Sequence, residues 1–598
     1  MVSRVFLAAT LLASPLAAQE SLFLHVPDPK SKTRVEATAL FSTPPPGGFL
    51  PVRITINNPS ENDGEITIRT TSSDGNYGGE GSEMTSSMPL DAPAGKATTH
   101  DILVPCTTIL NYSGGGQQMV ELRMSGSFGS NAANLQSSYG EGQPAVLLSE
   151  SLYTPNASLL DAEANGRSSS RYGGGGVFSG RFDPRAMPED WRAYSGYDGL
   201  AMTDTDWSVA SPGARNAMLR WNRLGGQLVI YAVSATTDLA SLGVADEGKG
   251  IRAADRSFGR IVVRSIESDL KLPPVATVNL FFSEAKLPVL NSSIREDFGS
   301  NWPLSISFEK QAYNYALFIL ILVAFGILVG PVNLFVFAKS GRRHRLFITT
   351  PLIALGTSVV LIALIIGIDG FGGRGVRVAL MEVRPDDGEN SAYIVQEQFS
   401  RTGVLLGGGF TVSEPVAITP VPLEATQWSR LTQMNQGGGM RYEMLLRDGK
   451  TDVDGDWFQS RSEQGQLVRA IIPTRGRIEA RSAVGAPSFL STFDFEIETL
   501  FFHDDAGGIW RADGITPGKA FTCAPTTPAD FDNFAGTAAR SLSVRTRRPL
   551  DVRKPPSALQ DRTNHFIAVT DAAPGIGTFP GIKWQTTRTY ITGPIARP

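Results

Sequence analysis

Two long apolar runs in the middle of the chain dominate its pattern of hydrophobic and polar positions. They cover residues 313–338 and 351–368, and only a short polar stretch separates them. Each run is long enough to cross a hydrocarbon core of ~30 Å at ~1.5 Å per residue. The pattern therefore predicts a two-helix transmembrane hairpin, with spans at residues 312–338 and 349–370 and a loop at residues 339–348.

The predicted loop is basic and sets the expected topology. Loops rich in Lys and Arg stay in the cytoplasm, so both flanking regions should lie outside the membrane. The topology-determining cations are Lys339, Arg342, Arg343 and Arg345.

The amino terminus agrees with an exported protein. Residues 1–18 combine Arg4, an apolar run too short to span, and a small-residue end at Ala18, which predicts a signal peptide; an uncleaved anchor is the alternative. We therefore expect a multi-pass protein of the bacterial inner membrane with most of its mass in the periplasm. A Gram-positive cell surface is the other setting that fits.

Residues 19–140 show the two-residue alternation of half-buried strands. Val52, Ile54 and Ile56 alternate with polar residues, and the alternation resumes at Ile66 after a turn that contains Gly64. This predicts a β-sandwich that contains a hairpin. The glycine- and serine-rich residues 125–138 are expected to form an exposed loop.

Residues 141–300 change to an α/β pattern. Continuous apolar runs at residues 145–148, 199–202 and 228–233 are typical of strands buried on both faces. Between the last two lies a helix signal, with Ser211 as cap and Pro212 at the first position. Strand, helix and strand in this order predict a parallel, right-handed crossover.

Residues 374–598 return to short strand patterns separated by turns, including residues 376–383, 392–396, 467–472 and 477–480. The predicted fold class is thus multidomain α/β plus β-sandwich with a two-helix transmembrane hairpin, mainly β outside the α/β domain. With 598 residues, 41% of them hydrophobic, the chain can bury several cores.

Composition excludes several kinds of partner. The net charge is −4 and no basic patch is interleaved with aromatic residues, so we predict no nucleic-acid partner. The five histidines are scattered and neither cysteine has zinc-ligand spacing, so we predict no metal and no cofactor. Asp452 and Glu463 bound a sequence similar to a calcium loop, but Trp457 replaces its glycine, and an acidic turn is expected.

The two cysteines, Cys106 and Cys523, fall in the same oxidising compartment under this topology. Two alternatives remain open from the sequence. They form a disulfide if their α-carbons approach closely enough, or they are two independent buried thiols.

Candidate ligand-binding residues follow the predicted parallel strands. Because such strands expose their carboxyl ends to ligands, the residues just after them are the candidates. The alternatives are a polar loop for the serines and, for the aspartates, either a cation site or turn residues that bond their own backbone. The candidates are Ser149, Glu150, Ser151, Asp204 and Asp206.

The α/β region resembles the class I glutamine amidotransferase-like domains of bacterial membrane-anchored proteins. The resemblance lies in Tyr197-Asp198-Gly-Leu-Ala-Met-Thr and in a helix from Ala217 that ends at Gly225-Gly226 before a strand. Active members use a cysteine nucleophile with a histidine nearby. Residues 143–300 contain neither residue type, so the resemblance implies a degenerate binding or scaffolding copy with no catalytic residues.

The hairpin carries a second resemblance. Val329-Gly330-Pro331-Val332-Asn333-Leu334 and the basic loop resemble uncharacterised bacterial two-span membrane proteins with the same exterior–hairpin–exterior layout. Auxiliary subunits of ABC transport systems, including ones named for gliding motility, combine a similar domain with membrane helices, which implies an ABC permease and ATPase as partners.

Two functional classes follow. The first is a non-catalytic scaffold or accessory subunit of an envelope or ABC-type transport complex. The alternative is an exported hydrolase or ligand-binding protein that acts on envelope glycan or peptide. A hydrolase needs a base, which His503 or His565 would have to supply from another domain.

Overall fold

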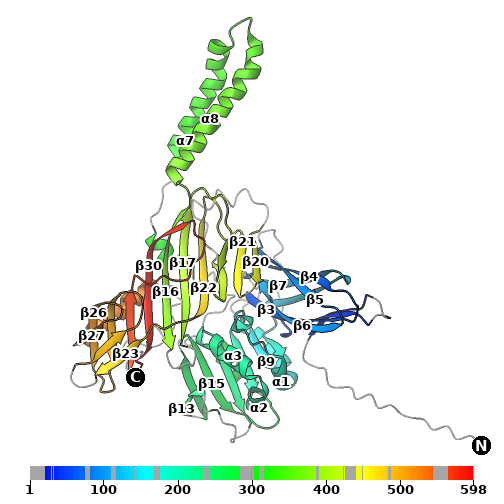
Figure 1. The fold of residues 1–598 in the computed structure, drawn as a ribbon, viewed down its shortest axis with the longest axis vertical. Coiled ribbons are helices and arrows are strands. Elements are labelled where there is room, and N and C mark those ends of the chain that lie inside the picture. The colour runs from blue at the N-terminus through cyan, green and yellow to red at the C-terminus, as the bar shows by residue number, and fades with distance from the viewer. Residues whose placement is uncertain are drawn as a thin grey trace, which may run out of the picture. The chain divides into compact units, whose positions relative to one another are not determined.

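Two structural units divide the chain in the computed structural model (Figure 1). The first holds most of residues 1–290, and the second holds residues 291–598 with two short earlier segments, 74–85 and 108–111. The structure describes residues 20–27, 30, 32–74, 81–109, 116–140, 143–167, 176–233, 239, 242–248, 250–256, 258–282, 298, 302–308, 315–384, 390–421, 423, 439–447, 449–482, 486–542 and 563–596. The predicted signal peptide lies outside these residues.

The first unit begins with the strands of the predicted β-sandwich, which form two groups. One is a four-stranded sheet in the order β1-β2-β3-β6, and the other runs in the order β5-β4-β7-β8. The strands are β1 (Glu20–His25), β2 (Arg34–Ala39), β3 (Gly48–Asn58), β4 (Gly64–Asp74), β5 (Glu83–Ala92), β6 (Lys96–Cys106), β7 (Gly116–Gly126) and β8 (Gly129–Tyr139).

The predicted pairing within the sandwich is wrong in one place. The alternating segments at Val52 and Ile66 are both strands, β3 and β4, but they do not form a hairpin. β3 pairs with β2 and β6, whereas β4 belongs to the other group. Alternation of apolar and polar residues specifies that each strand has one buried face. It is equally compatible with a hairpin and with a chain that crosses from one sheet to the other between the two strands.

Residues 125–138 are also not a loop. They form the tip and return strand of a hairpin in which β8 pairs with β7 from Gly116↔Tyr139 to Gly126↔Gly129. The turn requires Gly126 at φ 140° and Gly129 at φ 98°, which favour glycine. The small polar residues of β8 belong to a strand at the edge of its sheet, where half of the side chains face water.

The second part of the first unit is a seven-stranded sheet in the order β10-β9-β11-β12-β15-β14-β13. The first five strands are parallel, and β14 and β13 return antiparallel at one edge. In chain order the parallel strands follow the doubly wound order 2-1-3-4-5. They are β9 (Val146–Ser149), β10 (Ser179–Phe182), β11 (Gly199–Thr203), β12 (Gln227–Ala232) and β15 (Gly259–Ser265), followed at the edge by β14 (Ile251–Arg256) and β13 (Ala245–Gly248).

Helices connect these strands as the sequence predicts. α3 begins at Pro212, and the Ser211 hydroxyl accepts a hydrogen bond from the Ala214 amide, so the expected cap is confirmed. The parallel pairing of β11 with β12 confirms the predicted crossover. The helices of this part are α1 (Glu150–Asn165), α2 (Asp204–Val209), α3 (Pro212–Arg223) and α4 (Pro274–Phe282), with short 3-10 turns η1 (Pro184–Ala186) and η2 (Trp191–Tyr194).

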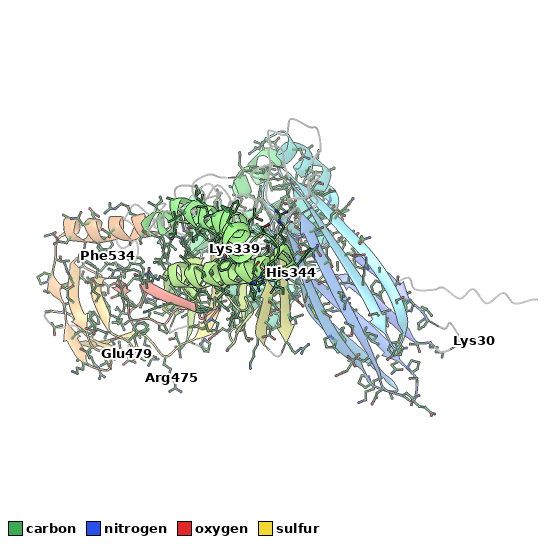
Figure 2. All side chains as sticks on the ribbon, turned by 90° about the horizontal axis from the view of Figure 1, so that it is seen from above. Lys30, Lys339, His344, Arg475, Glu479 and Phe534 are labelled. Atoms are coloured by element: carbon green, nitrogen blue, oxygen red, sulfur yellow. The ribbon has the colours of Figure 1, made fainter. Side chains whose placement is uncertain are left out.

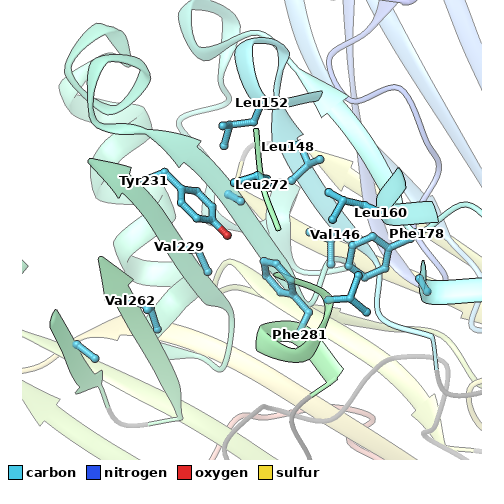
Figure 3. Packing of buried hydrophobic residues seen from close by; sticks show 14 residues of the cluster. Val146, Leu148, Leu152, Leu160, Phe178, Val229, Tyr231, Val262, Leu272 and Phe281 are labelled. Atoms are coloured by element: carbon cyan, nitrogen blue, oxygen red, sulfur yellow. The ribbon is translucent and has the colours of Figure 1, made fainter. Parts of the chain in front are cut away.

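A buried apolar cluster holds α1 and α4 against the sheet (Figure 3). Leu148 and Val229 from the strands meet Leu152 and Leu160 from α1, and each of the four is fully buried. Fully burying a side chain of this kind stabilises the fold by roughly 1.5–3 kcal/mol. The cluster therefore fixes the position of α1, whose first residues follow β9 directly.

Phe41 joins the sandwich to the α/β part within the first unit. Phe41 packs against Tyr194 and Tyr197, with ring centroids 5.7 and 5.3 Å away, and forms an isolated bridge with Phe182. The Tyr197 hydroxyl also donates a hydrogen bond to the Thr43 carbonyl over 2.7 Å. These buried contacts join the two parts into one unit.

The second unit is built on a nine-stranded sheet in the order β19-β22-β17-β16-β30-β29-β25-β26-β28. Its neighbouring strands pair antiparallel, except that β16 and β30 are parallel. Its strands are β16 (Gly373–Arg384), β17 (Ser391–Thr402), β19 (Val416–Val421), β22 (Glu463–Pro473), β25 (Ile497–His503), β26 (Ile509–Ile515), β28 (Ala524–Pro525), β29 (His565–Thr570) and β30 (Ile582–Pro594).

Smaller strand groups complete this unit. β23 (Ile478–Ser482), β24 (Ser488–Ser491) and β27 (Ala520–Thr522) form a three-stranded sheet. In a further group β21 pairs with β18 on one side and with β20 on the other; the strands are β18 (Phe410–Val412), β21 (Lys450–Gly455) and β20 (Arg441–Arg447). β20 also pairs in parallel with the first three residues of β5, and those three residues belong to this unit. The four strand patterns predicted after residue 374 are thus confirmed as strands.

One helix in this region was not predicted from the sequence. α10 (Pro528–Ser541) packs Phe531 against Phe501 of β25, with ring centroids 5.6 Å apart. Its signal is nevertheless present in the sequence, because Thr527 and Asp530 form a reciprocal capping box and Pro528 occupies the first helical position.

The predicted membrane hairpin is helical along both runs. The first helix is α7 (Tyr315–Ile327), which continues as the π-helical segment η5 (Leu328–Phe337). After the 3-10 turn η6 (Arg343–Arg345), α8 (Leu346–Asp369) returns beside it. Pro331 lies inside the π-helical segment, and its missing amide hydrogen accounts for the wider turn there.

Candidate functional site

The candidate site lies at the point where the order of the parallel strands reverses. β9 and β11 are neighbours, but their connections leave in opposite directions, to β10 on one side and to β12 on the other. In such sheets ligands bind outside the carboxyl ends of the two strands that flank this switch point. Ser149 is the last residue of β9 and Asp204 follows the last residue of β11, so the topology brings the two predicted groups together.

Three of the five predicted residues form one hydrogen-bonded chain. The hydroxyls of Ser149 and Ser151 are 3.0 Å apart, and the Ser151 hydroxyl donates to Oδ2 of Asp206 over 2.5 Å. Ser149 is fully buried, whereas Ser151 is half-buried. The chain therefore runs from the end of β9 to the start of α2.

Asp206 already has a structural role in this chain. Its Oδ2 accepts from the Thr203 amide over 3.1 Å, and the Thr203 hydroxyl accepts from the Asp206 amide over 3.1 Å. This reciprocal pair is a capping box at the start of α2. The oxygen that receives Ser151 is thus the same oxygen that caps the helix.

Asp204 and Glu150 make separate contacts. Asp204 is fully buried, and its Oδ1 accepts from the amides of Val233 and Thr205, which ties the end of β12 to the start of α2. Glu150 accepts from the Thr154 hydroxyl on the same helix and lies 3.9 Å from Arg181. Both aspartates bond backbone groups, as expected for turn residues, and no group of three or more His, Cys, Asp or Glu side chains is placed for a metal ion among the described residues.

The arrangement can donate and accept hydrogen bonds, and the ionisable group bonded to its serine hydroxyls is the Asp206 carboxylate. A serine nucleophile needs a neighbouring group that takes its proton, and that group is usually a histidine. Residues 143–300 contain no histidine. His503 and His565, the predicted sources of a base, belong to the second unit, where they face one another across β25 and β29.

The cysteines provide no reactive group either. Cys106, in the first unit, and Cys523, in the second, are each free and buried in the structure. Burial raises the pKa of the Cys106 thiol well above its ordinary value and that of Cys523 to about 12. Both thiols are therefore protonated at neutral pH and unreactive.

The predicted calcium-like loop is structural as well. Asp452 and Asp454 lie on β21, where Asp452 accepts from the Thr411 hydroxyl over 2.5 Å. Glu463 begins β22 and pairs with Arg401 at 2.6 Å. These carboxylates therefore bond separate protein groups, and Asp452 and Asp454 lie on a strand where an acidic turn was expected.

The predicted membrane hairpin is the other candidate functional feature of the chain. Large apolar side chains are exposed along both helices, with Phe335 71% and Phe347 86% exposed. Two helices of this chain, within the described residues, are long and apolar enough to cross a membrane. The cations Lys339, Arg342, Arg343 and Arg345 are all exposed in the connector, where Figure 2 labels Lys339 and His344.

One polar side chain joins the two helices. Asn333 is fully buried, its Nδ2 donates to the Thr350 hydroxyl over 2.9 Å, and its Oδ1 accepts from the Thr349 hydroxyl over 2.6 Å. Neither span contains Asp, Glu, Lys or Arg between residues 315 and 338 or between residues 346 and 368. The hairpin thus satisfies its deep polar group internally and leaves apolar side chains outside.

Both ends of the hairpin are attached to the same nine-stranded sheet. On the carboxyl side, α8 leads into β16 within a few residues. On the amino side, Trp302 lies just before the short helix α6 (Pro303–Ser307). The indole Nε1 of Trp302 donates a hydrogen bond to the buried Glu397 of β17 over 2.7 Å. Phe308 then packs against Phe399, with ring centroids 5.3 Å apart.

Comparisons with known proteins leave the chain without an assigned family. No protein-family model matches it, and neither does any curated protein. Among solved structures, a Paenibacillus sp. cycloisomaltooligosaccharide glucanotransferase complexed with cycloisomaltoheptaose is 12% identical with a TM-score of 0.17, over 36% of this chain and 30% of that one. A Kluyveromyces marxianus beta-glucosidase in complex with glucose is 9% identical with a TM-score of 0.10, over 85% of this chain and 47% of that one. Scores this low do not establish a shared fold.

Two features of the site were missed in the sequence, and only the first leaves a signal there. Thr203 and Asp206 have the spacing of a capping box, which predicts that the carboxylate bonds to backbone. The strand order could not be read from the chain, because apolar runs do not reveal which neighbour each strand takes. The switch point between β9 and β11 therefore emerged only from the fold.

Proposed function

We propose that this chain is a non-catalytic, membrane-anchored protein of the bacterial inner membrane, and that it serves as a scaffold or accessory subunit of an envelope or ABC-type transport complex. The observation that carries the proposal is the hairpin, whose apolar side chains are exposed along both helices while Asn333 bonds internally. Exposed apolar surface on this scale marks a membrane or partner contact. A pair of spans without ionisable groups anchors a protein and offers no path for an ion.

The α/β domain supports the non-catalytic part of the proposal. Its switch point places hydroxyls where a ligand would bind, but the carboxylate nearest to them caps a helix and there is no histidine in the domain. A degenerate amidotransferase-like domain that binds without turnover is consistent with this arrangement. The positive-inside rule places both units in the periplasm.

The test is purification of the tagged chain from its native membrane in mild detergent, after crosslinking in cells, with mass spectrometry of the accompanying proteins. The proposal predicts an integral membrane permease and an ATPase in a fixed ratio to the chain. Recovery of the chain alone after efficient crosslinking would contradict the accessory role and leave an independent anchored receptor.

A second candidate, an exported hydrolase, is favoured by one observation. Ser149, Ser151 and Asp206 form a connected chain at the switch point, which is the place where a nucleophile would act. A fluorophosphonate probe tests this directly, because it reacts only with activated serines. The non-catalytic account predicts no labelling of Ser149 or Ser151, and labelling that Ser149→Ala or Ser151→Ala abolishes would establish the hydrolase.

A further inference from the structure

An apolar loop lies directly beside the end of the second membrane helix. Residues 403–407 connect the end of β17 to the next strand, and Leu406 at their tip is 97% exposed. Phe371, two residues after the end of α8, is 66% exposed. Leucine and phenylalanine side chains with this much exposure are unusual away from the spans, and a bridge between Phe371 and Val404 brings their two segments together.

Backbone hydrogen bonds hold the loop against the helix end. The Val404 amide donates to the Gly370 carbonyl over 3.0 Å, the Gly372 amide donates to the Val404 carbonyl over 3.1 Å, and the Gly403 amide donates to the Gly372 carbonyl over 2.7 Å. Phe371 and Val404 form a parallel bridge. The loop therefore has a fixed position relative to Gly370.

A second set of bonds fixes the other side of the loop. The Leu405 amide donates to the Ser460 hydroxyl over 3.0 Å, and the Arg461 amide donates to the Gly403 carbonyl over 2.8 Å. Because both sides are held, the exposure of Leu406 is a feature of an ordered loop. An ordered, fully exposed leucine in water has no folding benefit, since its apolar surface stays hydrated.

The length of α8 indicates at which level of the membrane this loop lies. The helix has 24 residues, which corresponds to ~36 Å, against a hydrocarbon core of ~30 Å. Since α8 starts at the basic connector, its other end emerges on the opposite side, at the level of the lipid headgroups. Leu406 is two residues from Val404, so it lies within ~7 Å of that level.

We propose that Phe371, Leu405 and Leu406 form a lipid-contacting knuckle that inserts into the outer interface of the same bilayer that the hairpin crosses. Apolar residues at this depth enter the boundary between headgroups and acyl chains. Arg374, exposed three residues after Phe371, is placed to meet anionic headgroups. The knuckle would hold the nine-stranded sheet close to the membrane, and it rests on the proposed function, since it requires that the hairpin spans.

The experiment places a fluorophore at three positions, one at a time, in the full chain reconstituted alone into phosphatidylcholine–phosphatidylglycerol vesicles. Leu406→Cys carries the label in the knuckle, Leu355→Cys carries it on the lipid face of α8, where the leucine is 63% exposed, and Lys519→Cys carries it on an exposed loop between β26 and β27. The native thiols are buried and do not react. Quenchers are attached to the lipid near the headgroup or deep in the acyl chain.

The proposal predicts that the Leu406 label loses most of its fluorescence to the shallow quencher, that the Leu355 label loses most of it to the deep quencher, and that the Lys519 label loses little to either. If the Leu355 label is quenched and the Leu406 label is not, the knuckle is wrong while the spans stand, and the loop faces a protein partner or water. Equal quenching at Leu406 and Lys519 also overturns it. If the Leu355 label is not quenched, the spans fail, and the knuckle fails with them.

Discussion

At the scale of single residues, Asp206 decides how the switch point is interpreted. Its carboxylate accepts hydrogen bonds from the Thr203 amide and from the Ser151 hydroxyl through one oxygen. That oxygen is therefore part of the cap at the start of α2. The structure therefore favours a role in stability over a role in chemistry.

This role predicts that Asp206→Ala destabilises the first unit by about 1–2 kcal/mol, because the Thr203 amide and the Ser151 hydroxyl lose their acceptor. The measurement is thermal unfolding of the detergent-solubilised protein. Glu150→Ala is the matched control, and its contacts on the surface predict a change within about 0.5 kcal/mol. An unchanged unfolding midpoint for Asp206→Ala would show that the carboxylate is dispensable for folding and available to a ligand.

Asp504 provides a test of pH dependence. Burial alone would raise the pKa of its carboxyl, but hydrogen bonds from the Trp510 indole and the Gly508 and Ala506 amides, together with His503, outweigh burial and lower it below its ordinary value. A lowered folded-state pKa means that the stabilisation is present above the unfolded-state pKa and is lost as the pH falls through the folded-state pKa.

We therefore predict that Asp504→Asn lowers the unfolding temperature at neutral pH, and that the difference from wild type shrinks below about pH 4. Thermal unfolding of both proteins at a series of pH values measures this. A difference that stays constant across the acid range would show that the carboxylate charge does not contribute.

At the scale of elements, the sequence predicted which segments form strands and helices better than how they pair. The sequence predicted β9, β11 and β12 because strands buried on both faces leave continuous apolar runs. It predicted the helix from Pro212 because Ser211 and Pro212 are typical of a helix start. The predicted hairpin of β3 with β4 was wrong because partner choice is a tertiary property.

The missed elements have local explanations. β8 was taken for a loop because glycine, serine and asparagine favour turns, although an edge strand tolerates them when its partner β7 supplies the apolar side chains. α10 was missed because its apolar residues are sparse, yet its capping box was readable at Thr527 and Asp530. The five candidate site residues lie at the ends of β9 and β11 or in the first turns of the helices that follow, but their hydrogen bonds depended on the packing of α1 against the sheet.

The hairpin gives the prediction at this scale. Asn333→Ala should weaken the pairing of the two spans, because the hydroxyls of Thr349 and Thr350 lose their hydrogen bonds across the hairpin, while Thr349 keeps the Arg345 carbonyl of its own turn. Polar contacts between membrane helices contribute on average about 0.6 kcal/mol each. The measurement is the thermal unfolding of the detergent-solubilised protein for Asn333→Ala, Thr349→Ala and the double variant.

In this double-mutant cycle the destabilisations caused by Asn333→Ala and Thr349→Ala should not be additive, because either change removes the hydrogen bond between the two side chains. Thr357→Ala is the control, since its hydroxyl bonds the Ile353 carbonyl within its own helix. Fully additive effects of Asn333→Ala and Thr349→Ala would show that the two side chains do not interact in the membrane protein.

At the scale of the whole molecule, the account depends on one topological claim. A basic connector in the cytoplasm places everything else described by the structure on the other side of the membrane. The scaffold role, the periplasmic position of the switch point and the lipid-contacting knuckle all require this topology. The two native cysteines make it measurable, because both are buried, unreactive thiols that give little background.

The most direct measurement is the labelling of introduced cysteines by a membrane-impermeant maleimide in cells whose outer membrane has been made permeable. His344→Cys reports on the exposed connector, and Lys519→Cys reports on the second unit. The account predicts that Lys519→Cys is labelled while the inner membrane is intact, whereas His344→Cys is labelled only after the inner membrane is lysed. Labelling of His344→Cys while the inner membrane is intact, or protection of Lys519→Cys until the inner membrane is lysed, would contradict the topology and the proposals that rest on it.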